Sequence, residues 1–146
     1  TWTVANAARV TLAPLLEISA EDWRREIDVD LTGAFLVARA AARRMRASRT
    51  RGAIVLVGSW AADAPHAALP AYSVAKAGLR MLARCLALEL AADGVRVNEV
   101  APGYVDAGLS KQVFDRTPGL RERAAARVPT AEMLAPEEVA RLIAFL

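Results

Sequence analysis

Short apolar runs rich in β-branched residues alternate along this chain with longer segments of helical periodicity. One run covers residues 53–58, and another covers residues 95–100 between Gly94 and Pro102. A continuous apolar run of this length is typical of a strand that is buried in a parallel sheet. Parallel strands need a crossover between them, and an α-helix is the usual one. The alternation therefore predicts an α/β fold with a parallel sheet.

The same pattern gives the bounds of the expected elements. Residues 2–5 form the end of a strand, and a helix covers 20–48, with Ser19 as its N-cap. A second long helix covers 71–92 and stops at Gly94, short helices lie within 106–134, and Pro136 opens a final helix. The apolar stripe of the first long helix consists of Trp23, Ile27, Leu31, Phe35, Ala38, Ala42 and Met45.

Tyr72 and Lys76 carry the clearest chemical signal. They stand four residues apart on one helix, so the phenol and the ammonium group share a face. A neighbouring cation favours the phenolate, and we expect Lys76 to lower the pKa of Tyr72 into a useful range. Ser59 follows the predicted strand at 53–58, which places its hydroxyl at a carboxyl-terminal strand end, where open α/β sheets bind ligands. Taken alone, such a pair is usually a packed ring beside a solvated ammonium group, and the serine at a strand end does not decide between the two interpretations.

The order of motifs along the chain resembles the short-chain dehydrogenase/reductase family over nearly the whole length. The Tyr72–Lys76 pair matches the signature of that family, and Ser59 matches the serine that precedes it. The other matching segments are Val4–Ala8, Trp23 with Asp28–Phe35, Leu86–Leu90, Val95–Asn98, Pro102-Gly103 and Pro136–Ala140.

The resemblance implies a partial Rossmann-like, doubly wound parallel sheet, the second half of such a domain, over residues 1–146. It also implies catalytic roles. Tyr72 would exchange a proton with the substrate oxygen, Ser59 would hold that oxygen, and Lys76 would tune Tyr72 and bind the nicotinamide ribose. Asp30 stands where the family has a catalytic asparagine. If that asparagine acts through its backbone carbonyl, Asp30 can replace it; if its amide is needed, the proton relay is altered.

The implied cofactor is NAD or NADP, and we assign no metal site. The resemblance places Asn6, Tyr72 and Lys76 beside the cofactor ribose, and Pro102, Gly103 and Val105 beside the nicotinamide. Ala8 and Ala107 depart from the family pattern. The Gly-rich turn that carries the cofactor pyrophosphate is absent, because the eight glycines are dispersed. We therefore expect a fragment without that turn and without the last strand. Its cut sheet would expose apolar surface, and alone it would be inactive.

The resulting hypothesis is an NAD(P)-dependent oxidoreductase acting on a ketone or secondary alcohol. The four-residue spacing of Tyr72 and Lys76 argues against the related enoyl reductases, in which the two residues lie further apart. The alternative is a binding or regulatory protein of the same fold with weakened catalysis, which Asp30, Ala8 and Ala107 leave open. The resemblance also implies a homodimer or homotetramer formed through the helices at 20–48 and 71–92. Substrate, cofactor preference and reaction direction stay undetermined.

Composition adds less specific expectations. The single cysteine, Cys85, cannot form an internal disulfide, which favours a reducing compartment, and we expect it to be buried in its apolar helix. No leader and no apolar run near 18 residues is evident, so we expect a cytoplasmic protein without a membrane partner. The net charge of +3 comes with arginines clustered at a helix end, which argues against a nucleic-acid partner. His66 fits a solvated loop residue better than a substrate contact.

Overall fold

A computed structural model describes residues 1–146 and divides them into two compact units. The first unit is Thr1–Ala101 with Leu146, and the second is Pro102–Phe145. The first contains β1 (Trp2–Ala5), α1 (Ala20–Ile27), a π-helix (Asp28–Gly33), α2 (Ala34–Ala47), β2 (Gly52–Val57), a 3₁₀ turn (Trp60–Ala62), α3 (Pro70–Leu90), a second 3₁₀ turn (Ala91–Asp93) and β3 (Val95–Val100). The second contains α4 (Gly108–Arg116), α5 (Leu120–Ala125) and α6 (Pro136–Phe145).

The three strands form one parallel sheet in the order β1-β2-β3, which confirms the predicted α/β fold. Ala5 pairs with Leu56, and Val57 pairs with Val100. The carboxyl ends of all three strands therefore meet at one edge. Trp2 and Val4 of β1, a strand at the side of this sheet, are exposed.

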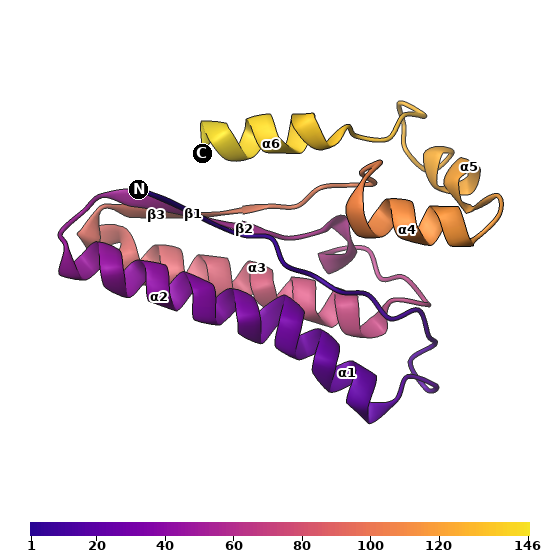
Figure 1. The fold of residues 1–146 in the computed structure, drawn as a ribbon, viewed down its shortest axis with the longest axis horizontal. Helices are drawn as coiled ribbons and strands as arrows, with labels where there is room; N and C mark the ends of the chain where they lie inside the picture. The colour runs from indigo at the N-terminus through magenta and orange to yellow at the C-terminus, as the bar shows by residue number, and fades with distance from the viewer. The chain divides into compact units, whose positions relative to one another are not determined.

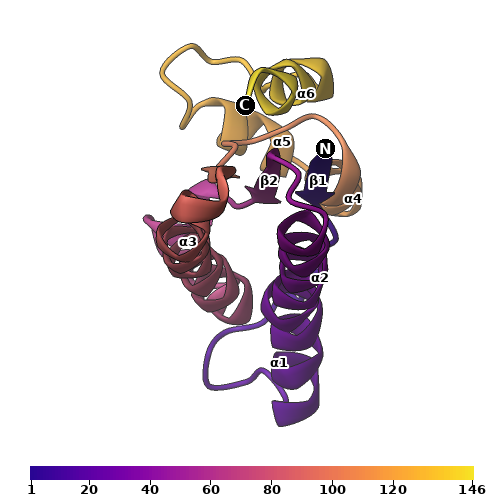
Figure 2. The same cartoon turned by 90° about the vertical axis from the view of Figure 1, so that its left-hand side faces the viewer.

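The long helices α2 and α3 lie side by side against one face of the sheet (Figures 1 and 2). Their contact is built on small residues, because Ala38 and Ala42 of α2 and Ala83 of α3 are buried together with Leu79 and Leu90. Ile54, Leu56 and Val97 meet them from the sheet. Alternate strand residues point to the same face, so one set of strand positions supplies this core.

The predicted helix at 20–48 is one helical run, but it is not α-helical throughout. Ser19 caps it as expected, since its hydroxyl accepts a hydrogen bond from Asp22 N at 3.0 Å. Residues 28–33 then adopt π-helical geometry between α1 and α2. A π-helical turn is rare and is frequently found at functional sites. The periodicity of the sequence did not reveal it, because the apolar residues continue in steps of three and four.

The second long helix ends close to its predicted boundary. Gly94 follows the short 3₁₀ turn with φ of +68°, a left-handed conformation that glycine adopts without a steric penalty. The expectation for Cys85 was wrong, because this residue is exposed on α3. It stands three residues from Leu88 and four from Met81, both also exposed, so helical spacing puts it on the outer face.

The second unit contains three helices and one isolated β-bridge. Val105 and Leu134 form that bridge, and Asp106 N donates to Leu134 O at 2.9 Å. Tyr104 and Phe114 pack with ring centroids 6.3 Å apart. The bridge closes the loop that carries α4 and α5. No helix of the chain has the length and apolar character required to cross a bilayer.

Candidate functional site

The carboxyl edge of the sheet gathers the predicted residues of the first unit. Asn6 follows β1 directly and is exposed, whereas Ser59 stands two residues beyond β2 and is buried. The parallel register aligns the ends of the two strands, so both residues lie at the same edge. Sheets of this type bind their ligands at this edge.

Ser59 has an extended backbone and caps the 3₁₀ turn that follows it. Its hydroxyl oxygen accepts a hydrogen bond from Ala61 N at 3.2 Å. This contact fixes the side-chain oxygen and leaves the hydroxyl proton available to an acceptor. The same hydroxyl favours the phenolate of Tyr72, so the serine at the end of β2 acts on the phenol on α3.

A charged network holds the chain on both sides of Ser59. Arg80 of α3 donates through Nε to Glu99 Oε2 of β3 at 2.7 Å, and its Nη1 also binds Asp63, which ends the 3₁₀ turn. Glu99 lies directly over Gly58, since a Cβ added at Gly58 would stand 2.0 Å from Glu99 Oε1. Glycine at position 58 is therefore what lets Glu99 reach Arg80 beside the serine.

Lys76 is buried beneath Tyr72, with 3% of its surface exposed. Its Nζ donates to Val57 O at 3.0 Å and lies 5.3 Å from the centroid of the Tyr72 ring. One of its three N–H donors is thus used on the end of β2. The helical spacing of Tyr72 and Lys76 does bring the two groups together, and Lys76 sits on the inner side, toward the sheet.

Asp30 completes the group from the π-helix. It is fully buried, with 0% exposed surface, and its Oδ1 accepts from Arg9 N at 2.8 Å. Its Oδ2 lies 4.0 Å from Lys76 Nζ and has no hydrogen-bonding partner in the chain. The structure therefore gives the Asp30 side chain a charge contact with Lys76, a contact that a neutral asparagine would not supply.

The expected effect of Lys76 on Tyr72 is not what the structure gives. The pKa of Tyr72 is raised, because burial penalises the phenolate; the Ser59 hydrogen bond opposes this, while the charges of Asp30 and Glu26 add to it. Burial likewise lowers the pKa of Lys76, against the opposing charges of Asp30 and Glu99. Burial also raises the pKa of Asp30, against the Arg9 hydrogen bond and the Lys76 charge. Desolvation is the largest influence on the pKa of this phenol.

Glu26 is a member of this cluster that the sequence interpretation missed. It is fully buried on α1, and its charge acts on both Asp30 and Tyr72. The available signal was its position four residues before Asp30, on the same side of a helix. The expected apolar stripe passed through the adjacent Ile27 instead, which made Glu26 resemble an ordinary solvated residue.

Three predicted cofactor residues belong to the second unit. Pro102 follows β3 along the chain with Ala101 between them, Gly103 is exposed, and Val105 forms the bridge to Leu134.

His66, in the loop before α3, accepts a hydrogen bond from Ala68 N through Nδ1 at 3.3 Å and stacks edge-on against Trp60. These contacts give His66 a place in the structure of the loop.

The converging groups are a hydroxyl, a phenol and a buried ammonium group, with two carboxylates behind them. Such a set can bind one oxygen atom of a ligand and exchange a proton with it.

A cavity of about 820 Å³ lies elsewhere, near the amino ends of the strands, and is lined in part by Arg51, Gly52, Gly94 and Val95. It contains none of the predicted site residues.

Comparison with known proteins identifies relatives along the entire chain. A family model described as Enoyl-(Acyl carrier protein) reductase matches residues 2–146. The chain is 46% identical over 144 residues to cis-4-hydroxycyclohexanecarboxylate dehydrogenase of Sinomonas cyclohexanicum, which covers 98% of this chain and 56% of that protein. The chain spans about half the length of the curated relatives it matches.

Solved structures agree with these relatives. An oxidoreductase of the short-chain dehydrogenase/reductase family from Burkholderia thailandensis superposes with a TM-score of 0.90 at 37% identity, over 99% of this chain and 56% of that one. A gluconate 5-dehydrogenase from Burkholderia cenocepacia, in complex with NADP and tartrate, gives a TM-score of 0.93 at 28% identity with the same coverage. The similarity therefore extends across both units of the chain.

The contact between Gly58 and Glu99 gives a test of how Ser59 is positioned. We expect Gly58→Ala to destabilise the full-length protein by about 1–3 kcal/mol, because the new methyl group displaces Glu99 from Arg80. Gly103→Ala is the matched control, since a Cβ there meets no atom within 4 Å. Urea denaturation without cofactor measures both. Combining Gly58→Ala with Glu99→Ala should cost less than the sum of the two single changes; additive effects would contradict this contact.

Proposed function

The chain belongs to the short-chain dehydrogenase/reductase family, and we propose that the protein containing it transfers hydride between NAD or NADP and a ketone or secondary alcohol. The observation that carries this proposal is the convergence of Ser59, Tyr72 and Lys76 at the carboxyl edge of the sheet. The relatives reported above are named as dehydrogenases of hydroxylated compounds, which supports the same reaction class.

Tyr72 is the proposed acid and base. In the direction of reduction its phenol donates a proton to the carbonyl oxygen, and in the direction of oxidation it takes the proton of the alcohol. Ser59 donates its hydroxyl hydrogen to the same oxygen and stabilises the negative charge that develops there. Ser59 acts on the Tyr72 phenol, which supports placing both side chains at one substrate oxygen.

Lys76 and Asp30 hold the proposed acid in place. Lys76 is fixed by Val57 O at 3.0 Å and by the charge of Asp30, and it keeps positive charge close to the ring of Tyr72. Positive charge next to a phenol favours the phenolate. In this chain that effect works against burial and against two carboxylates, which makes the protonation state of the carboxylates important for the reaction.

The residues present fit the nicotinamide half of a dinucleotide. Lys76 has N–H donors beyond the one given to Val57 O, and the exposed Asn6 stands at the same sheet edge; both would bind the ribose. Pro102, Gly103 and Val105 are the proposed nicotinamide contacts. When bound, the cofactor supplies or accepts the hydride. The choice between NAD and NADP depends on residues outside this set.

Two observations bear on alternative functions. The matching family model carries the description of an enoyl reductase, whereas the Tyr72–Lys76 spacing of four residues supports carbonyl and alcohol chemistry. A binding or regulatory protein with weakened catalysis is the other alternative. The carboxylate at position 30 supports this alternative, as do Ala8 and Ala107. The turnover of the Tyr72 variant described below distinguishes it from the enzyme hypothesis.

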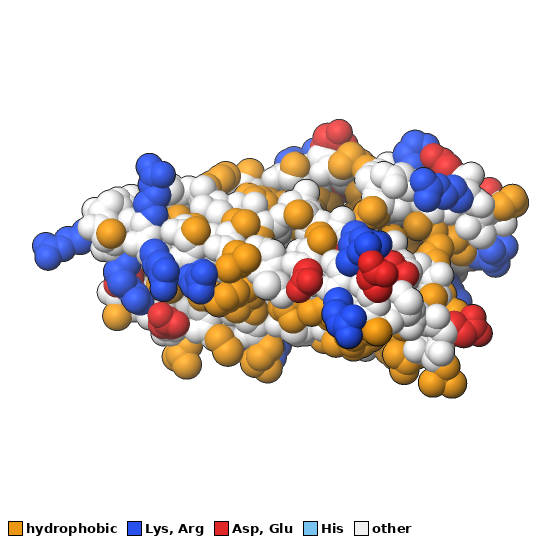
Figure 3. Space-filling view, turned by 60° about the horizontal axis from the view of Figure 1, so that its bottom comes forward, with side chains coloured by type: hydrophobic (Ala, Val, Ile, Leu, Met, Phe, Trp, Pro, Cys, Tyr) orange, Lys and Arg blue, Asp and Glu red, His pale blue; other side chains and the backbone are white.

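We also propose that the full protein forms a homodimer or homotetramer through α2 and α3. Their outer faces carry exposed apolar side chains, and those of α3 recur every seven residues at Val74, Met81 and Leu88. Figure 3 shows hydrophobic side chains along this helical face, with Lys and Arg gathered at the left, where α2 ends in Figure 1. An apolar stripe along neighbouring helices is typical of a protein interface. Cys85 lies on the same stripe, so assembly would bury it.

Tyr72→Phe is the direct test of the proposed acid and base. The change removes the phenolic oxygen and keeps the ring, so we expect turnover of a ketone or secondary alcohol to fall by about 10²- to 10⁴-fold. Nucleotide binding, followed by cofactor fluorescence, should persist. Ser48→Ala, an exposed hydroxyl at the end of α2, is the control and should leave turnover unchanged. Unchanged turnover in Tyr72→Phe would reject the mechanism.

Met81→Glu tests the proposed interface. Met81 is 55% exposed on α3, and a buried, unpaired carboxylate would oppose assembly. We expect the variant to elute as a smaller species than the wild type in size-exclusion chromatography with light scattering. Cys85 should also react faster with a thiol reagent. Leu16→Glu is the control, since Leu16 is 97% exposed on the loop before α1. A wild-type protein that is already monomeric would contradict the interface.

A further inference from the structure

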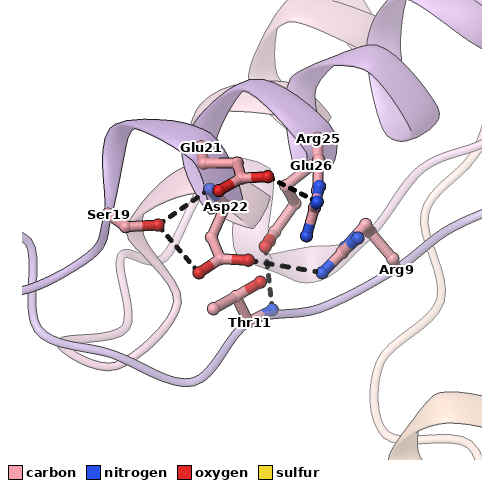
Figure 4. Close-up of polar contacts among 7 residues, drawn as sticks. All are labelled: Arg9, Thr11, Ser19, Glu21, Asp22, Arg25 and Glu26. Atoms are coloured by element: carbon pink, nitrogen blue, oxygen red, sulfur yellow. Dashed lines mark hydrogen bonds and ion pairs between the residues drawn. The ribbon is translucent and has the colours of Figure 1, made fainter.

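The buried side of α1 carries a carboxylate without a full set of partners. Glu26 has 0% of its surface exposed, although the neighbouring carboxylates Glu21 and Asp22 are accessible to solvent. Figure 4 shows the contrast: Glu21 reaches Arg25 on the outer side of the helix, whereas the carboxylate of Glu26 points inward to the segment that contains Arg9 and Thr11. A fully buried glutamate is unusual unless it is paired.

Glu26 and Asp30 are held in the same way. Glu26 Oε2 accepts from Thr11 N at 2.8 Å, and Asp30 Oδ1 accepts from Arg9 N at 2.8 Å. The other oxygen of each carboxylate is buried and lacks a hydrogen-bonding partner in the chain. The backbone of residues 9–11 thus donates a hydrogen bond to one of the two oxygens of each carboxylate. The Thr11 side chain also favours the charged form of Glu26, although Thr11 Oγ1 is outside hydrogen-bonding geometry with any partner.

The cations that face the pair do not neutralise both members. Lys76 of α3 lies 4.0 Å from Asp30 and is itself bound to Val57 O. Arg9 acts on both carboxylates through its charge, but its Nη2 lies 3.7 Å from Asp22 on the outer side of α1, and its buried Nε has no partner. Two ionised carboxylates four residues apart, both buried, would repel each other. Keeping both charged costs several kcal/mol in a setting of this kind, by order of magnitude.

We propose that Glu26 and Asp30 together hold one proton at neutral pH, and that Glu26 is a positioning residue that controls the charge next to Lys76 and Tyr72. The pair titrates as a unit, so its apparent pKa values belong to both residues. When the pair holds its proton, the cation of Lys76 acts on Tyr72 with one carboxylate opposing it. When the proton is lost, two carboxylates oppose it.

The titratable and charged groups that face the pair lie in the loop after β1, on α1, in the π-helix and on α3. They are Arg9 from the loop after β1, Asp22 on α1, Asp30 in the π-helix, and Lys76 and Tyr72 on α3. Burial raises the pKa of Glu26, contacts with Thr11 oppose this, and the charge of Asp30 raises it further. This direction agrees with a retained proton.

Glu26→Gln in the full-length protein, without cofactor, tests the proton by its effect on stability. An acid whose folded pKa is raised contributes stability that is present below its unfolded value, here 4.5, and that is lost as pH rises through the folded value. Glutamine stays neutral at every pH, so the variant does not lose this stability as pH rises. The melting temperature of Glu26→Gln should therefore rise relative to that of the wild type as pH increases above 4.5. Glu21→Gln, an exposed carboxylate on the same helix, should run parallel to the wild type.

Infrared spectroscopy tests the same proton without relying on a variant that folds. The wild type at neutral pH should show the C=O stretch of a protonated carboxyl group, with a shift in heavy water. That band should weaken as the pair titrates and should be altered in Glu26→Gln. A wild-type spectrum without a protonated carboxyl band at neutral pH, or a Glu26→Gln melting curve parallel to the wild type, would overturn the proposal.

The effect on catalysis rests on the proposed function and has its own readout. Where the pair has lost its proton, the charge of Glu26 raises the pKa of Tyr72, so Glu26→Gln should move the alkaline part of the pH dependence of alcohol oxidation toward lower pH. A positive infrared result with an unmoved pH profile would reject the link to Tyr72 and keep the shared proton. Absence of any oxidoreductase activity in the wild type would reject the proposed function alone.

Discussion

A buried ammonium group is the constraint on which the candidate site depends. Removing a charge from water costs several kcal/mol, and proteins accept that cost where the charge is hydrogen-bonded and paired. Lys76 meets both conditions through Val57 O at the end of β2 and Asp30 in the π-helix. The ammonium group thereby ties together the sheet, the π-helix and α3. Ser59 and Tyr72 take their positions from the same three elements.

The carboxylates behind Lys76 introduce a second constraint, which opposes the first. Asp30 stabilises the cation, but burial raises the pKa of Tyr72, and the charges of Asp30 and Glu26 raise it further. At a site of this kind the pKa of the phenol depends on the sum of the neighbouring charges, and no single residue determines it. A carboxylate at position 30 and another at position 26 make that total depend on pH. This is the physical sense in which Asp30 differs from a neutral residue at the same place.

Much of the fold could be predicted from the sequence, because its local signals agree. The apolar runs at 53–58 and 95–100 became β2 and β3, Ser19 capped α1, and Gly94 ended the second long helical segment. Ser59 and the Tyr72–Lys76 pair became candidates through their spacing and through the family resemblance of the segments around them. The burial of Lys76 was less accessible, because a lysine on an amphipathic helix is usually solvated.

The parts that could not be predicted depend on packing between distant segments. The π-helix at Asp28–Gly33 changes the direction of side chains without changing the apolar period, so no sequence signal marked it. The burial of Glu26 depends on the segment at Arg9 and Thr11 folding over it. The exposure of Cys85 depends on which side of α3 faces the sheet, and alanines on both sides leave that undetermined.

The measurement that tests this account most directly is the titration of Lys76 Nζ by ¹⁵N nuclear magnetic resonance in the full-length protein and in Asp30→Asn. We expect Lys76 to lose its proton below the ordinary lysine range, because burial lowers its pKa. Asp30→Asn should lower that pKa further, since the Asp30 charge holds the proton on Lys76. A lysine that titrates in the ordinary range, or one that Asp30→Asn leaves unchanged, would contradict the central claim that this buried ion pair organises the site.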